Sequence, residues 1–190
     1  MFSIRDKVIL ITGGSKGIGL GIAKAFSKAG ARVHVCGRNE PAPDTFPEGS
    51  NIRFANCDVR DPESAQTLIT EIREIEGRID VLINNAGGGP PADAATASPR
   101  FTESIIRLNL LAPLLMSQIA YDALKESNGA IINIASVSAI RSSPGTMAYG
   151  AAKAGLLNAT ISLAQEWGPH IRVNAIIAGL IKTEAANEHY

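Results

Sequence analysis

The sequence contains few of the residues that mark several large classes of protein. Among its 190 residues only Cys36 and Cys57 are cysteines, and they do not form a CxxC motif. We therefore expect a reduced, cytoplasmic chain. The histidines, His34, His170 and His189, lie far apart and lack the spacing of metal ligands, which argues against a metal centre.

No charge of one sign dominates either. Eighteen Lys and Arg residues balance eighteen Asp and Glu residues, which argues against a nucleic-acid surface and against a polybasic membrane patch. No apolar run approaches the roughly 18 residues that a membrane-spanning helix needs. The start, MFSIRDK, reaches charged residues before any apolar stretch, unlike a secretory signal.

Apolar runs rich in Val and Ile alternate along the chain with stretches of helical periodicity. The expected strands span residues 7–14, 32–37, 51–59, 79–87, 129–136 and 171–177. The expected helices run from 17 to a stop at Gly30, from 62 to 76, over about 100–126 and over 147–167. This order predicts an α/β fold: a Rossmann-like, doubly wound parallel sheet with helices on both faces, in a single domain over residues 1–190.

Ligands of such sheets bind at the carboxyl ends of the strands. The first expected strand runs into TGGSKGIG, residues 12–19, where Gly13, Gly17 and Gly19 stand at a strand-to-helix turn. Glycines let the backbone approach a pyrophosphate, and the helix N-terminus offers free N–H groups, so the turn predicts dinucleotide binding. The alternative is a glycine turn that only permits close packing of helix and strand.

The end of the second expected strand indicates which dinucleotide is bound. An acid at this place favours NAD, but here Gly37 is followed by Arg38, and Lys16 lies within the glycine turn. Two cations and no acid favour a 2′-phosphate, hence NADP(H) over NAD(H). The alternative is that both cations are ordinary solvated charges.

Two further strand ends carry polar residues. Asp58 is a candidate acceptor for an adenine amino group, with a capping role as the alternative. The motif NNAG, residues 84–87, offers small residues against which a cofactor ribose can lie. For Asn84 and Asn85 the alternative is hydrogen bonding between strand ends, and the two roles can coexist.

Ser136 ends the fifth expected strand, and Tyr149 and Lys153 follow in the first turn of the next helix. Together with the glycine turn, NNAG and Asn109, this pattern resembles the short-chain dehydrogenase/reductase family, in its simple one-domain branch. The resemblance covers residues 7 to about 183. Taken alone, the serine is read as a helix cap and the Tyr–Lys pair as a surface pair.

The resemblance implies a catalytic role for four residues. Tyr149 donates a proton in carbonyl reduction, or accepts one in alcohol oxidation, and the Lys153 ammonium lowers the pKa of its phenol. Ser136 hydrogen-bonds the substrate oxygen, and the main-chain carbonyl of Asn109 binds a water of the proton relay. The cofactor contacts that we expect are made by Gly13, Ser15, Lys16, Gly17, Ile18, Gly19, Arg38, Asp58, Val59, Asn85, Ala86, Gly87, Tyr149, Lys153, Gly179, Ile181 and Thr183.

Pro113 lies four residues after Asn109. Proline has no N–H and its ring crowds the carbonyl four residues earlier, so we expect it to free the Asn109 carbonyl and to kink the helix. The alternative is that Pro113 begins a separate helix that Asn109 only caps.

The chain departs from the family pattern towards its end. Ala178 replaces a proline that family members usually carry, and the sequence stops at Tyr190. Family members continue with a substrate-covering segment and a seventh strand, so we expect a C-terminally shortened chain whose sixth strand is a sheet edge.

Taken together, the sequence predicts an NADP(H)-dependent oxidoreductase for a carbonyl or secondary alcohol. The expected lining, residues 87–95 and 137–145, is mostly small and apolar, which fits a hydrophobic ketone or 3-oxoacyl substrate. The alternative is a non-catalytic nucleotide-binding protein of the same fold. The resemblance also implies a homodimer or homotetramer that packs the helices over 100–126 and 147–167.

Overall fold

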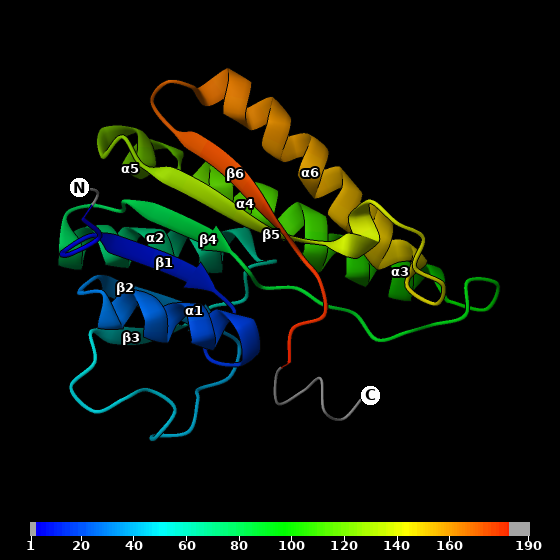
Figure 1. The fold of residues 1–190 in the computed structure, drawn as a ribbon, viewed down its shortest axis with the longest axis horizontal. Coiled ribbons are helices and arrows are strands. Elements are labelled where there is room, and N and C mark those ends of the chain that lie inside the picture. The colour runs from blue at the N-terminus through cyan, green and yellow to red at the C-terminus, as the bar shows by residue number, and fades with distance from the viewer. Residues whose placement is uncertain (1–2, 183–190) are drawn as a thin grey trace.

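A computed structural model describes residues 3–182 of the chain (Figure 1). Its six strands are β1 (Val8–Thr12), β2 (Arg32–Gly37), β3 (Ile52–Asn56), β4 (Val81–Asn84), β5 (Ala130–Ser136) and β6 (Arg172–Ala178). They form one sheet in the order β3-β2-β1-β4-β5-β6, and every pair is parallel. The order reverses at β1, so the switch point lies between β1 and β4, as a Rossmann-like sheet requires.

The helices are α1 (Gly17–Lys28), α2 (Pro62–Glu76), α3 (Pro99–Ile106), α4 (Ala112–Ile119), α5 (Tyr121–Glu126) and α6 (Met147–Trp167). A π-helical turn, η1 (Arg107–Leu111), joins α3 to α4, and a 3₁₀ turn, η2 (Val137–Ala139), follows β5. The stretch expected as helical over 100–126 is therefore divided into several segments. Among the described residues, no helix combines the length and the apolar character that crossing a bilayer requires.

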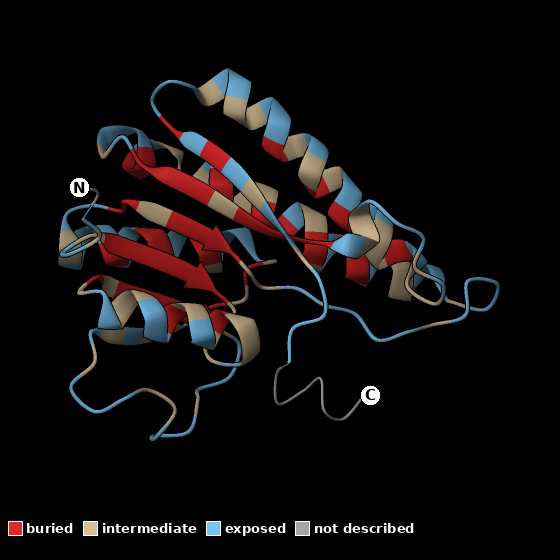
Figure 2. Cartoon of the chain, viewed as in Figure 1, coloured by how far each residue is buried: buried red, intermediate tan, exposed pale blue. Residues whose placement is uncertain are grey.

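The sheet has a core on each face. One core joins alternate residues of β1, β4 and β5 to α2, α4, α5 and the end of α6. The other joins the remaining strand residues to α1, and Phe46 from the proline-containing loop between β2 and β3 packs against it. β1 is buried along its whole length, and β4 and β5 along most of theirs, as an all-parallel sheet covered on both faces requires (Figure 2).

β6 is less covered than the other strands. It pairs with β5 alone within residues 3–182, and Ile176 and Ile177 on it are 53% and 43% exposed. Figure 2 shows exposed segments along this strand.

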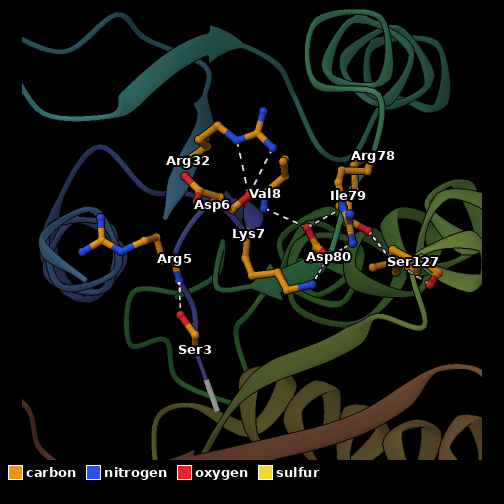
Figure 3. A network of polar contacts seen from close by, with 11 residues as sticks. Ser3, Arg5, Asp6, Lys7, Val8, Arg32, Arg78, Ile79, Asp80 and Ser127 are labelled. Atoms are coloured by element: carbon orange, nitrogen blue, oxygen red, sulfur yellow. Dashed lines mark hydrogen bonds and ion pairs between the residues drawn. The ribbon is translucent and has the colours of Figure 1, made fainter. Parts of the chain in front are cut away.

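The amino ends of β1 and β4 are joined by charged groups rather than by apolar ones. The buried carboxylate of Asp80 accepts hydrogen bonds from the Lys7 ammonium and from the main-chain N–H of Val8, both at 2.9 Å (Figure 3). Arg78 donates to the same carboxylate, from Nε at 2.9 Å. This cluster lies at the opposite end of the strands from the predicted site.

Candidate active site

The N-terminus of α1 lacks the side-chain cap that α2 and α3 have. Its N-cap residue, Lys16, makes no side-chain cap hydrogen bond, and the first turn contains no acidic residue. In contrast, Asp61 accepts a hydrogen bond from the N–H of Glu63 in α2, and Ser98 accepts one from the N–H of Phe101 in α3. The first N–H groups of α1 therefore remain available for an anion.

The glycine turn leaves no room for a side chain at Gly13 or Gly19. A Cβ on Gly19 would lie 2.3 Å from the Gly13 carbonyl oxygen, and one on Gly13 would lie 3.0 Å from the Cα of Ala86. Asn85 Nδ2 donates to the carbonyls of Thr12 and Gly13, at 2.9 and 3.1 Å, and so fixes the turn. This smooth backbone beside an uncapped helix fits the pyrophosphate of a nicotinamide cofactor.

Thr12 is a positioning residue that our sequence analysis missed. Its hydroxyl accepts hydrogen bonds from the main-chain N–H groups of Asn85 and Ala86, both at 3.0 Å, and donates to the Ile83 carbonyl at 3.4 Å. It thus ties the carboxyl end of β1 to that of β4. The available signal was a hydroxyl at the end of an otherwise apolar strand.

Asn84 is occupied inside the protein. Its side chain is 3% exposed, and its Nδ2 lies 2.9 Å from Asn133 Oδ1 and 3.1 Å from Ser117 Oγ. Asn133 in turn donates to Thr160 Oγ1 at 2.9 Å. The strand-end hydrogen bonding that we considered for Asn84 is present, and it links β4, β5, α4 and α6.

Two exposed cations stand near the end of β2. Lys16 precedes α1, and Arg38 follows β2. Ser15 Oγ would lie 3.4 Å from a Cβ built on Gly37, so the glycine turn and the end of β2 are close together. The main chain of Arg38 is held by Asn56, whose Nδ2 donates to its carbonyl at 2.9 Å.

Asp58 follows β3 and is paired with Arg60, which our sequence analysis did not single out. Arg60 Nη2 lies 2.6 Å from Asp58 Oδ2. The hydrogen bond from Arg60, with its charge, lowers the pKa of the Asp58 carboxyl to about 2. Asp61, rather than Asp58, caps α2, and the neighbouring Val59 is buried.

Lys153 is almost completely buried in the second turn of α6. Its ammonium donates to the Ile134 carbonyl at 2.7 Å and lies 5.8 Å from the centre of the Tyr149 ring. Burial disfavours the charged form and lowers the pKa of Lys153 to about 8. The interpretation of this pair as a surface pair is wrong for the lysine, which is 3% exposed.

Asn109 is buried in η1 and holds the loop that follows β4. Its Oδ1 accepts from the N–H of Gly88 at 2.8 Å, and its Nδ2 donates to the carbonyls of Gly88 and Ile105, both at 2.9 Å. A Cβ on Gly87 would lie 2.8 Å from Asn109 Oδ1 and 3.3 Å from Lys153 Nζ. The β4 loop, η1 and α6 therefore meet at Gly87.

The helical stretch is irregular just before Pro113, where we expected this proline to disturb it. The N–H of Ala112 donates to the carbonyl of Arg107, five residues earlier, which is the π-helical pattern. Pro113 has no N–H, so the Asn109 carbonyl receives no α-helical hydrogen bond from it. Pro113 stands in the first turn of α4, but Asn109 does more than begin that helix, because its side chain holds Gly88.

Ser136 ends β5 and is 9% exposed. Its hydroxyl oxygen accepts from the N–H of Ser138 at 3.2 Å, so the capping role considered for it is present. Ser138, Ser143 and Thr146 are hydrogen-bonded to one another through their hydroxyls in the loop before α6. This loop precedes the turn of α6 that carries Tyr149.

The predicted residues after β6 are not joined to this cluster by contacts in the described part of the chain. Gly179 has nothing within 4 Å of its Cβ position, and Ile181 is 46% exposed. Thr183 lies outside the described residues.

A small pocket opens beside Tyr149. Its lining has no charged side chain and comes from the loop after β4, from α3 and from the start of α6: Pro90, Ala92, Ala94, Ala97, Phe101, Thr102, Ile105, Gly145, Thr146, Met147, Ala148 and Tyr149. Part of the expected lining, residues 87–95, is thus present. The helix α3 was not predicted to contribute.

The sequence profile of the short chain dehydrogenase family matches residues 7–190. The chain belongs to this family. A 3-oxoacyl-[acyl-carrier-protein] reductase of Chlamydia muridarum is 36% identical to this short chain dehydrogenase over 187 residues, which cover 94% of this chain and 75% of that protein. An NAD-dependent glycerol dehydrogenase of Listeria innocua is 33% identical over 187 residues, or 96% and 74% of the two chains.

Solved structures agree with the fold. The structure described as ElxO with NADP bound has a TM-score of 0.91 and 31% identity, and the match covers 97% of this chain and 77% of that one. The expected Rossmann-like fold and family are therefore confirmed. This short chain dehydrogenase is an NAD(P)-dependent oxidoreductase.

Proposed function

We propose that this short chain dehydrogenase interconverts a carbonyl and a secondary alcohol, with Asn109, Ser136, Tyr149 and Lys153 as its catalytic residues. The observation that carries the proposal is the buried Lys153 ammonium, 5.8 Å from the Tyr149 ring. A bound nicotinamide supplies or accepts the hydride. In reduction the Tyr149 phenol gives its proton to the substrate oxygen, while Ser136 donates a hydrogen bond to that oxygen.

A catalytic role would account for the cost of burying the Lys153 ammonium. Burial costs Lys153 stability while it is charged, and its positive charge favours the phenolate of Tyr149 in the same cluster. In the opposite direction, alcohol oxidation, the same phenolate accepts the proton. Through its hydrogen bonds to Gly88, Asn109 holds the loop after β4 beside Lys153.

We propose NADP(H) as the preferred cofactor. Lys16 and Arg38 are exposed cations at the glycine turn and at the end of β2, with Ser15 beside Gly37, and this set suits a 2′-phosphate. The remaining cofactor contacts are proposed as predicted, including Ile18, Val59, Gly179, Ile181 and Thr183. The structural relative with NADP supports this choice, and the NAD-dependent glycerol dehydrogenase makes it worth testing.

The substrate is proposed to be apolar near its carbonyl. The pocket beside Tyr149 has no charged lining, which favours a hydrophobic ketone or a 3-oxoacyl group over a highly charged compound. We further propose one domain over residues 1–190, a cytoplasmic protein with free buried cysteines, and a homodimer or homotetramer. Light scattering on the purified protein tests the oligomer.

The catalytic proposal is tested with Tyr149→Phe. The change removes the proton donor and keeps the ring, so turnover of a ketone panel with NADPH should fall about 10²- to 10⁴-fold while NADPH binding stays close to wild type. Tyr121→Phe is the matched control, because Tyr121 packs edge-on against Trp167, with ring centres 5.1 Å apart. Equal turnover by wild type and Tyr149→Phe would contradict the proposal.

The cofactor proposal is tested with Arg38→Asp. A carboxylate at this strand end repels a 2′-phosphate and accepts a hydrogen bond from a ribose hydroxyl, so preference should shift towards NADH, by about tenfold or more. The ratio of kcat/KM for the two cofactors measures this shift. Lys24→Asp makes the same change of charge at an exposed position of α1, and its ratio should stay at the wild-type value.

A further inference from the structure

The turn after β3 contains a closed pair of side chains, Asp58 and Arg60. Arg60 Nε donates to Oδ1 of Asp58 at 2.9 Å and to Oδ2 at 3.2 Å, and Nη2 donates to Oδ2 at 2.6 Å. The main-chain N–H of Arg60 adds a fourth hydrogen bond, to Oδ1 at 3.1 Å. Both side chains are about one third exposed, so the pair is accessible from the surface.

These contacts use the acceptor capacity of the carboxylate. A carboxylate has about four lone-pair positions, and a guanidinium presents its donors in a rigid fork that matches them. Three N–H groups of Arg60, one of them shared between both oxygens, therefore occupy the Asp58 carboxylate. An amino group of a ligand can therefore donate a hydrogen bond to this carboxylate only by displacing Arg60.

The pair is built into the turn rather than laid across the surface. The N–H of Asp61 donates to the Asp58 carbonyl at 2.9 Å, which closes the turn, and Arg107 Nη2 donates to the Arg60 carbonyl at 3.3 Å. The main chain of Arg60 is thus held from two sides. Next to it, Val59 lies beside Thr12 and Ala86, at the carboxyl ends of β1 and β4.

We propose that Arg60 is a specificity-determining residue of the cofactor site. By occupying Asp58, it removes the selection for a purine with an amino group at position 6, so that a 6-oxo purine dinucleotide binds about as well as the adenine one. The guanidinium also offers donors that a 6-oxo group can accept. This inference rests on the proposed function, because it takes Asp58 to lie beside the purine of the bound dinucleotide.

The test measures the dissociation constants of NADPH and of its hypoxanthine analogue by nicotinamide fluorescence, without turnover. For wild type we expect the two constants to agree within about threefold. Arg60→Met frees the Asp58 carboxylate, which accepts from an amino group and repels an oxo group, so preference for NADPH should rise about tenfold or more. Adding Asp58→Asn to Arg60→Met should remove most of that gain, since the charged acceptor is lost.

The controls separate this inference from the function on which it rests. Arg53→Met removes an arginine that is 63% exposed and pairs with Glu76, and it should leave the ratio of the two constants unchanged. Arg60→Gln gives a second variant should the methionine not be tolerated, and it should raise the preference in the same direction. NADPH binding with an unchanged ratio in both Arg60 variants overturns the role of Arg60 alone. A wild-type protein that binds neither dinucleotide overturns the proposed cofactor site, and the inference with it.

Discussion

At the scale of single residues, the site combines groups whose burial has a cost. Among residues 3–182, the buried Lys153 ammonium makes one hydrogen bond, to the Ile134 carbonyl. Asn84 Oδ1 is buried without a hydrogen-bond partner among the described residues. Such groups lower the stability of the fold and are retained where chemistry or a bound group uses them.

The burial of Lys153 predicts a pH dependence of stability. Its pKa is about 8 in the folded protein and 10.5 in the unfolded chain, so the unfolded state binds more protons between these values. The free energy of unfolding should therefore rise with pH from about 8 to 10.5, by on the order of 3 kcal/mol for this residue. Below pH 8 the full cost of the buried charge is present.

Urea unfolding at several pH values, for wild type and Lys153→Met, measures this effect. The difference in unfolding free energy between the two proteins should change in favour of wild type as pH rises through this window. Lys24→Met, which removes an exposed lysine, controls for the loss of an ammonium. A difference that stays constant with pH would show that Lys153 is not a buried, titrating cation.

Side-chain roles could be predicted from sequence where spacing decides them. Tyr149 and Lys153 lie one helical turn apart, and the structure brings the lysine to the tyrosine ring. The pairing of Asp58 with Arg60 was not predictable in this way, because two residues in a turn can meet or part according to the rotamer. Likewise, the hydroxyl of Thr12 reaches β4 only once the register of β1 on β4 is known.

At the scale of elements, α1 differs from α2 and α3 in how it begins. α2 and α3 start with a capping side chain and a proline in the first turn, whereas α1 starts with a glycine and no side-chain cap. A capped start stabilises a helix locally. The missing cap of α1 leaves its N–H groups for the proposed pyrophosphate, so stability and binding make opposite demands on this helix.

Alanine substitutions of two glycines in α1 test whether helix stability and cofactor binding make different demands on this helix. Gly21 is exposed and nothing lies within 4 Å of its Cβ position, so Gly21→Ala should raise the free energy of unfolding by about 0.5–1 kcal/mol. Gly19→Ala would place a Cβ 2.3 Å from the Gly13 carbonyl oxygen and should cost about 1–3 kcal/mol, together with cofactor affinity. Denaturant unfolding measures the change in stability of each variant, and NADPH titration measures the change in cofactor affinity. A Gly19→Ala variant more stable than wild type would contradict the close packing of this turn.

Element boundaries were predictable where capping residues and glycines mark them. Asp61, Pro62 and Gly77 delimit α2 as the sequence indicated, and Gly77 adopts a left-handed conformation. The sequence also indicated an irregularity near Pro113, but not that it takes the form of a π turn. A proline removes one hydrogen bond, and the packing of Asn109 against Gly88 accompanies the wider turn actually seen.

At the scale of the whole molecule, the two ends of the sheet differ in kind. The carboxyl ends carry glycines and small polar groups around the proposed site, and the amino ends carry buried carboxylates paired with cations. Glu76, at the end of α2, pairs with His34 at 2.9 Å and with Arg32. Asp80 holds Lys7, Arg78 and the main chain of β1 (Figure 3). The carboxyl ends thus carry the proposed binding site, and the ion pairs at the amino ends hold neighbouring elements together.

Asp80→Asn should lower the stability of the protein without changing its affinity for the cofactor. Burial alone would raise the pKa of Asp80, but the hydrogen bonds from Val8, Lys7 and Arg78 lower it, so the stability that its charge provides is lost as pH falls through that lowered value. At neutral pH the change should destabilise the protein by about 1–3 kcal/mol, because it removes the charge that two cations and an N–H satisfy. NADPH affinity should remain close to wild type, and a large loss of affinity with unchanged stability would contradict this division.

The strand order also constrains how the protein is made. β1 is the first strand to be synthesised, yet it lies between β2 and β4, and the contact of Val8 with Asp80 joins residues 72 positions apart. β2 and β3 can dock on one side of β1 early, whereas its other side has no partner until residue 84 has been translated. A shorter nascent chain therefore exposes one edge of β1, the strand that is fully buried in the finished protein. Such an unpaired edge can pair with a wrong strand unless a chaperone shields it or β4 is synthesised soon afterwards.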